Sequence, residues 1–98
     1  MDDLTIRQFQ TYIRERYEAT DRQRGTPATF LWFTEEIGEL ASALALAQSD
    51  RIDRANLEEE FADVFAWLCT LANINDVDLA AALARKYPAD GGPEGVKS

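Results

Sequence analysis

Apolar residues recur every three or four positions along most of this chain, and this spacing constrains the fold more than any other feature. Ile6, Phe9, Ile13 and Tyr17 show it near the start. Residues at this spacing lie on one face of an α-helix, whereas a half-buried strand requires strict alternation of apolar and polar residues. No segment alternates convincingly. The pattern therefore predicts an all-α chain.

Turn and capping residues divide this pattern into four predicted helices, at about residues 3–24, 27–47, 53–72 and 77–86. We expect Asp2 or Asp3 to cap the first helix and Gly25 to end it. Thr26-Pro27 is a typical start for the second, because proline at the first helical position loses no hydrogen bond. Asp53 or Asn56 is the expected cap of the third helix, and Pro88 follows the fourth.

The second and third predicted helices each carry a continuous apolar stripe. These stripes comprise Phe30, Phe33, Ile37, Leu40, Leu44 and Ala47 in one helix, and Leu57, Phe61, Val64, Leu68 and Leu71 in the other. We expect the two stripes to face each other in an antiparallel hairpin within a helical bundle. Residues 1–88 form the predicted domain, and residues 89–98, rich in glycine and proline, a flexible tail. With 46% hydrophobic residues the chain has more apolar material than one hairpin can bury, which predicts a homodimer or homotetramer.

Charge and apolar run length exclude several classes of function. The chain has 18 acidic against 10 basic residues, and its net charge of −8 disfavours binding to nucleic acid or to anionic membranes. No apolar run approaches the roughly 18 residues of a membrane span. The start of the sequence has no signal-peptide pattern, and Cys69 is the single cysteine. We expect a cytoplasmic protein.

One pattern of acidic, apolar and small residues occurs twice in the predicted hairpin. Residues 35–40 read EEIGEL, and residues 59–64, 24 positions later, read EEFADV. Each copy places two acids three residues apart on one helix face, Glu36 with Glu39 and Glu60 with Asp63. At 1.5 Å per residue, Glu39 lies about 13 Å and Glu60 about 10 Å from the hairpin loop. The four carboxylates are thus expected at nearly the same height.

Carboxylates gathered in this way repel one another unless a cation offsets their charge. Oxygen-only ligation favours a hard ion, Mg²⁺ or Mn²⁺. The chain contains no histidine, which excludes the Glu-x-x-His pattern of di-iron bundles and argues against zinc. A solvated acidic face is the alternative interpretation, because each pair by itself is common on helices of acidic proteins.

The order Glu35-Glu36-x-x-Glu39, followed by Glu60-x-x-Asp63, resembles the signature of the all-α nucleoside triphosphate pyrophosphohydrolases. That group includes MazG, the dimeric dUTPases, the dCTP pyrophosphatases and the phosphoribosyl-ATP pyrophosphohydrolases. The likeness extends from about Phe30 to Pro88. It implies a four-helix MazG-like bundle completed by homo-oligomerisation. The implied reaction is Mg²⁺-dependent hydrolysis of a non-canonical or surplus nucleoside triphosphate to the monophosphate and pyrophosphate.

The resemblance also implies roles for individual residues. Its metal ligands correspond to Glu36, Glu39, Glu60 and Asp63, and Glu35 would orient or deprotonate the attacking water. Trp67 could stack on the nucleobase or belong to the core, and Trp32 could contact the base, contact a partner or simply pack. Lys86 could contact phosphate, although a lysine at a helix C-terminus is also favoured by the helix dipole.

Two other functions stay open at this point. One is a dedicated pyrophosphohydrolase for phosphoribosyl-ATP, and the other is a non-enzymatic acidic module that binds a nucleotide or a protein. Some relatives carry asparagine four residues after the lysine, where this chain has Asp90. That departure leaves the preferred nucleobase and sugar unassigned.

Overall fold

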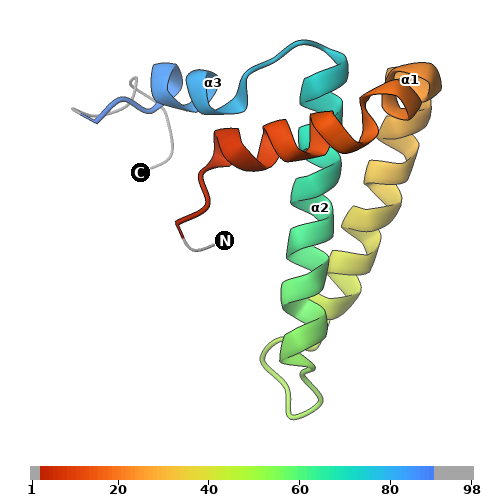
Figure 1. Cartoon of the computed structure of the whole chain (residues 1–98). Helices are drawn as coiled ribbons and strands as arrows, with labels where there is room; N and C mark the ends of the chain where they lie inside the picture. Colours follow the sequence, from red (N-terminus) through yellow and green to blue (C-terminus); the bar gives the residue numbers. More distant parts are fainter. Residues whose placement is uncertain (1–2, 90–98) are drawn as a thin grey trace.

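The computed structural model describes residues 3–89, and all its regular structure in that range is helical (Figure 1). The elements are α1 (Ile6–Ala45), α2 (Arg54–Ile74) and α3 (Leu79–Lys86). The predicted all-α fold is confirmed. The predicted flexible tail, residues 89–98, lies outside the described residues except for Ala89.

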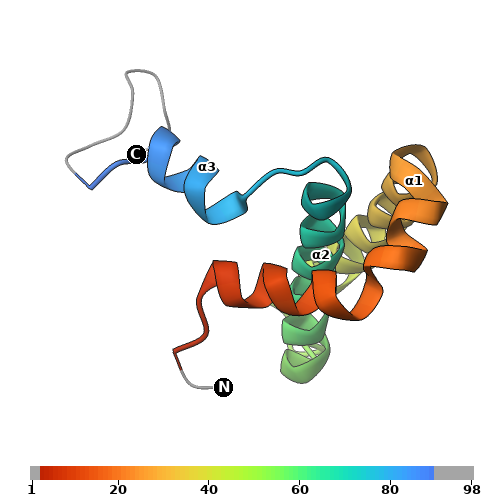
Figure 2. The ribbon, with the colours of Figure 1, turned by 45° about the horizontal axis from the view of Figure 1, so that its top comes forward.

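Helix α1 consists of two arms that meet at Gly25. The backbone of this glycine has φ 80° and ψ 172°, a conformation that residues with a side chain rarely adopt. The N-terminal arm (residues 6–24) runs across α2, and the C-terminal arm (residues 26–45) runs alongside it (Figures 1 and 2). The predicted boundary between the first two helices is therefore a sharp bend within one element. Pro27 lies in the first turn after the bend, where a proline costs little.

The helix starts differ from the prediction in two places. The N-cap of α1 is Thr5, not Asp2 or Asp3, because Thr5 and Gln8 form a reciprocal capping box. Asp53 caps α2 as expected, by accepting a hydrogen bond from the Asn56 backbone. Helix α3 begins at Leu79, two residues later than predicted, because Asp78 accepts a hydrogen bond from the Ala81 backbone and acts as its cap.

The C-terminal arm of α1 and helix α2 form the predicted antiparallel hairpin (Figure 1). Only part of the predicted stripe of this arm is buried, however. Phe30, Ile37 and Leu44 are about half exposed, whereas Thr29 and Ala43 are buried. From Thr29 onward, the buried and partly buried positions of this arm follow four- and three-residue spacing and are Thr29, Phe33, Glu36, Leu40 and Ala43.

Helix α2 shows the same offset between the predicted stripe and the buried face. Leu57 is buried, but Phe61 and Leu68 are exposed. The prediction that these stripes pack on each other inside one chain is therefore confirmed only in part. The stripe residues that are buried or partly buried are Phe33, Leu40, Ala47, Leu57, Val64 and Leu71. The other stripe residues stay at the surface of the chain, namely Phe30, Ile37, Leu44, Phe61 and Leu68. Glu36, next to Ile37 in sequence, is partly buried.

Buried amides fix the N-terminal arm across the end of α2. The Gln10 side chain donates to Asn73 Oδ1 at 2.9 Å, and the Asn73 side chain donates to the Gln10 carbonyl oxygen at 3.2 Å. Gln10 Oε1 also accepts from the Leu79 backbone N–H at 3.0 Å. These bonds tie the arm to α2 and to the start of α3. Among the described residues, no helix is both long enough and apolar enough to cross a membrane.

Candidate metal centre

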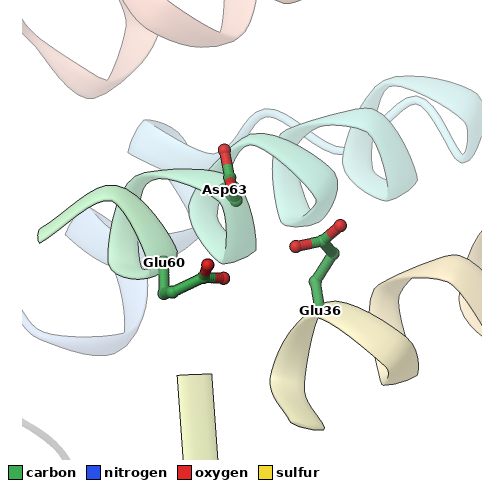
Figure 3. Close-up of side chains that lie close together, drawn as sticks. All are labelled: Glu36, Glu60 and Asp63. Carbon is green, nitrogen blue, oxygen red and sulfur yellow. The ribbon is translucent and has the colours of Figure 1, made fainter. Parts of the chain in front are cut away.

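Three carboxylates meet between the two helices of the hairpin (Figure 3). Glu36 extends from the C-terminal arm of α1, and Glu60 and Asp63 extend from α2, one turn apart. One oxygen atom of each side chain lies within 4.8 Å of the corresponding atoms of the other two. The hairpin thus brings together three of the four predicted ligand residues at matching height.

Burial and mutual repulsion both act on this cluster. Glu36 and Glu60 are partly buried, and Oε2 of each is buried without a hydrogen-bond partner in the part of the chain that the structure describes. Desolvation is the main cause that raises the pKa of Glu36, and the negative charges of Glu39 and Asp63 raise it further. The pKa of Glu60 is raised by desolvation first, and then by the same two neighbours. Within residues 3–89, no basic group is among the causes that shift the pKa of either glutamate.

The other two predicted acids lie at the edge of the cluster. Glu39 is exposed, yet its charge is the largest coulombic cause of the raised pKa of both Glu36 and Glu60. Glu35 is also exposed, and its charge contributes the smallest of the causes that raise the pKa of Glu36. Both side chains can therefore approach a ligand at the cluster from the solvent side.

The donor set fits a hard divalent cation. Every candidate ligand atom is a carboxylate oxygen, the type that Mg²⁺ and Mn²⁺ prefer. A cation among the three side chains would give partners to the two buried oxygens that have none. It would also cancel the repulsion that raises the pKa of Glu36 and Glu60.

The two predicted tryptophans lie next to each other, one turn from the carboxylates. Trp32 precedes Glu36 by four residues, and Trp67 follows Asp63 by four. Their rings are nearly parallel, with an interplanar angle of 12° and centroids 6.5 Å apart. Half of Trp32 is exposed. The rings thus form an accessible aromatic wall beside the cluster.

Lys86 is the predicted site residue that this chain does not bring to the carboxylates. It lies in the last turn of α3, which packs on the N-terminal arm of α1, away from the hairpin (Figures 1 and 2). Within one chain, Lys86 therefore lies on a different element from all three clustered carboxylates.

Two residues at the site were not predicted from the sequence. The Arg24 guanidinium lies over the Trp67 ring, 5.1 Å from its centroid, and Asp21 binds Arg24 at 2.6 Å. Asp21 is only 5% exposed. Asp21 follows Ile13 and Tyr17 at four-residue spacing. A charged residue within this apolar stripe was the feature of the sequence that could have indicated a buried functional group.

Comparison with known proteins identifies the family. The model of the MazG nucleotide pyrophosphohydrolase domain matches residues 24–88, more than half of the chain. No curated protein matches the chain. The matched range contains all three clustered carboxylates, and MazG domains generally depend on a divalent metal. The chain belongs to the MazG nucleotide pyrophosphohydrolase family, and it is a hydrolase that acts on nucleotide pyrophosphate bonds.

Proposed function

We propose that the chain hydrolyses a nucleoside triphosphate to the monophosphate and pyrophosphate with Mg²⁺ as its cofactor. Glu36, Glu60 and Asp63 hold the ion, and Glu39 completes the ligand set from the solvent side. Mn²⁺ can substitute, because it has the same preference for oxygen ligands. The observation that carries this proposal is the convergence of three carboxylate oxygens within 4.8 Å, beside two buried oxygens that lack partners.

The acidic field of the protein makes the cation necessary for substrate binding. With a net charge of −8, the chain repels a triphosphate on its own. When bound, Mg²⁺ supplies charge neutralisation at the phosphate oxygens and a lowered pKa for water in its coordination shell. The carboxylates would fix the position of the cation between the helices, next to the aromatic wall, and the cation would attract the phosphate chain to that place.

Glu35 is the residue that we assign to the attacking water. It is exposed, and it immediately precedes Glu36, so its carboxylate lies on the solvent side of the cluster. There it can accept a proton from water while the bond between the α- and β-phosphoryl groups breaks. The water oxygen bonds to the α-phosphorus, its proton passes to the Glu35 carboxylate, and pyrophosphate leaves with the bridging oxygen.

The aromatic wall provides a surface for the nucleobase. Trp67 and Trp32 each lie one helical turn from a carboxylate, so a base can stack there while its phosphates reach the cluster. We assign Lys86 to a phosphate contact from a neighbouring copy of the chain.

Assembly into a homodimer or homotetramer is part of this proposal. The exposed apolar face consists of Phe30, Ile37, Leu44, Phe61 and Leu68, each between 39% and 55% exposed. These residues come from both helices of the hairpin. An apolar surface of this kind is typical of a protein–protein interface, and a second copy offers the same helical surface in return. We propose that the substrate is a non-canonical or surplus nucleotide, which the enzyme removes from the cellular pool.

Product analysis tests the proposed reaction. The protein is incubated with Mg²⁺ and a panel of nucleoside triphosphates that includes damaged or non-canonical bases and phosphoribosyl-ATP. We expect pyrophosphate and a monophosphate as products, with activity lost in Glu36→Gln and Asp63→Asn. Glu58→Gln is the control, because Glu58 is an exposed acid of α2 that pairs with Arg54 outside the cluster. Release of single phosphate, or full activity of both cluster variants, would contradict the proposal.

A further inference from the structure

A cavity of about 400 Å³ lies between the N-terminal arm of α1 and helix α2. Its lining includes Tyr17, Asp21 and Arg24 from the arm, and Ala66, Trp67 and Thr70 from α2. The volume is within the range of small-molecule sites, about 300–1,000 Å³. A cavity of this size can take a planar ring together with part of an attached sugar.

The cavity is next to the carboxylate cluster along the same helix face. Trp67 and Thr70 follow Asp63 by four and seven residues. At 1.5 Å per residue these positions lie about 6 Å and about 10 Å further along the α2 axis. A nucleotide with its phosphates at the cluster therefore has its base within reach of the cavity.

Asp21 is an unusual group to find in the wall of this cavity. It is 5% exposed, and its Oδ1 accepts a hydrogen bond from Arg24 Nη2 at 2.6 Å. Its Oδ2 is buried and has no hydrogen-bond partner among the described residues. A buried carboxylate oxygen without a donor is costly to the fold, and such an atom in a native protein calls for a ligand or a water molecule that supplies the donor.

Arg24 holds the Asp21 side chain in place. Arg24 Nε donates to Thr29 Oγ1 at 2.9 Å, and its guanidinium lies over the Trp67 ring. Asp21 Oδ1 is thus committed to a fixed partner, while Oδ2 is free to accept from another group. The carboxylate accepts hydrogen bonds but cannot donate any.

We propose that Asp21 makes this site specific for nucleotides whose base carries an exocyclic amino group, against their keto counterparts. The inference rests on the proposed function, because it takes the ligand of the cavity to be the base of the substrate. An amino group donates to Oδ2, whereas a keto oxygen at the same position faces a negative charge and leaves Oδ2 unpaired. Cytosine and adenine present such an amino group, and uracil and hypoxanthine present the keto oxygen.

This selectivity comes from a part of the chain outside the matched MazG domain. The domain model begins at residue 24, so Tyr17 and Asp21 precede it. The carboxylate cluster, which acts on the phosphates, lies inside the matched range. The N-terminal arm therefore adds base selection to a phosphate site that the family shares.

The experiment compares pairs of substrates that differ at the position in question. We measure kcat/KM with Mg²⁺ for CTP against UTP, and for ATP against ITP. We expect the amino member of each pair to be preferred by roughly 10- to 100-fold, the range for one hydrogen bond to a buried charge. In Asp21→Asn the ratio should fall at least tenfold or invert, because the amide can accept from Arg24 and also donate to a keto oxygen.

Glu18→Gln is the matched control, since it removes the same charge from the same arm at an exposed residue that pairs with Arg22. Its ratios should equal those of the wild type. Asp21→Ser, which removes the charge and keeps a small polar side chain, serves as a second variant if Asp21→Asn does not fold. A wild-type ratio near one, a keto preference, or an unchanged ratio in the Asp21 variants would overturn the inference.

Failure of base selection can be told apart from failure of the proposed reaction. Trp32 and Trp67 are the only tryptophans of the chain, so their fluorescence reports binding without hydrolysis. If no nucleotide is hydrolysed, dissociation constants for CTP and UTP are compared by this signal in the wild type and in Asp21→Asn. Tighter binding of CTP that is lost in the variant supports the inference, and equal binding of both nucleotides overturns it.

Discussion

Glu36→Gln should stabilise the protein in the absence of divalent cations, although it removes a residue of the functional site. Glu36 lies in a cluster whose three ligand atoms are within 4.8 Å of one another. Its charge therefore faces two like charges, and no basic group is among the causes that shift its pKa. Glutamine has almost the same shape, and its amide can donate a hydrogen bond to either neighbouring carboxylate.

The size of the effect follows from the separation of the charges. At 4.8 Å two unit charges repel by about 0.9 kcal/mol in water and by about 3.5 kcal/mol at an effective dielectric constant of 20. Glu36 is only partly buried, so solvent and salt screening favour the lower figure. We expect Glu36→Gln to add about 1 kcal/mol to the free energy of unfolding. For a domain of this size that corresponds to a rise in Tm of roughly 4–8 °C.

Thermal unfolding with and without Mg²⁺ provides the assay. In EDTA the variant should melt above the wild type. A ligand that binds only the folded state stabilises it by about 2.7 kcal/mol at 100 times its Kd. Added Mg²⁺ should therefore raise the Tm of the wild type strongly and that of Glu36→Gln only weakly, so that the order of the two proteins reverses.

Glu58→Gln is the control for a general charge effect. Glu58 is exposed and pairs with Arg54 at 3.3 Å, a contact worth at most about 0.5 kcal/mol. This control should melt close to the wild type and keep the full response to Mg²⁺. The reasoning is refuted if Glu36→Gln is no more stable than the wild type in EDTA and responds to Mg²⁺ to the same extent.

Three further predictions concern pH, a buried thiol and a helical glycine. Because burial and like charges raise the pKa of Glu36 and Glu60, the folded state without metal holds their protons more tightly than the unfolded state does. The stability from this source is present below the ordinary glutamate pKa and is lost as pH rises through the raised pKa values. The Tm measured in EDTA should therefore fall over that pH range. In Glu36→Gln the fall in Tm should be smaller. Burial raises the pKa of Cys69 to about 11, and Cys69 is 0% exposed. An aromatic disulfide reagent at pH 8 should therefore modify this thiol only at the rate of unfolding. Rapid modification of the folded protein would contradict the burial of Cys69. A Cβ built at Gly38 meets no atom within 4 Å, so Gly38→Ala should raise the free energy of unfolding by about 0.5–1 kcal/mol in urea titration, and a decrease would show that a partner packs there.

The helices and the height of the carboxylates were predictable because both depend on local spacing. A rise of 1.5 Å per residue fixes how far each acid lies from the hairpin loop, whatever else packs on the helices. Glu36, Glu60 and Asp63 therefore meet as the spacing indicates. Glu39 was predicted as a fourth ligand, but it is exposed, because the helix turns the face that carries Glu36 toward α2.

The rotation of the helices was not predictable from apolar content. Phe30, Ile37 and Leu44 belong to the predicted stripe and are exposed, whereas Thr29 and Ala43, outside that stripe, are buried. A helix that buries one face inside the chain and a second face against a partner carries two apolar stripes. Periodicity identifies both stripes but does not indicate which of them packs inside the chain. The steep crossing of the N-terminal arm depends on the hydrogen bonds between Gln10 and Asn73, which are 63 residues apart and leave no local pattern.

Locating a bound ion tests the metal centre most directly. Mn²⁺ has the oxygen preference of Mg²⁺ and scatters X-rays anomalously, so a crystal grown with Mn²⁺ shows where the cation lies. We expect an anomalous peak among the Glu36, Glu60 and Asp63 carboxylates, absent from crystals of Asp63→Asn grown in the same way. A peak at another position, or an equal peak in the variant, would contradict the assignment of these three residues as the metal ligands.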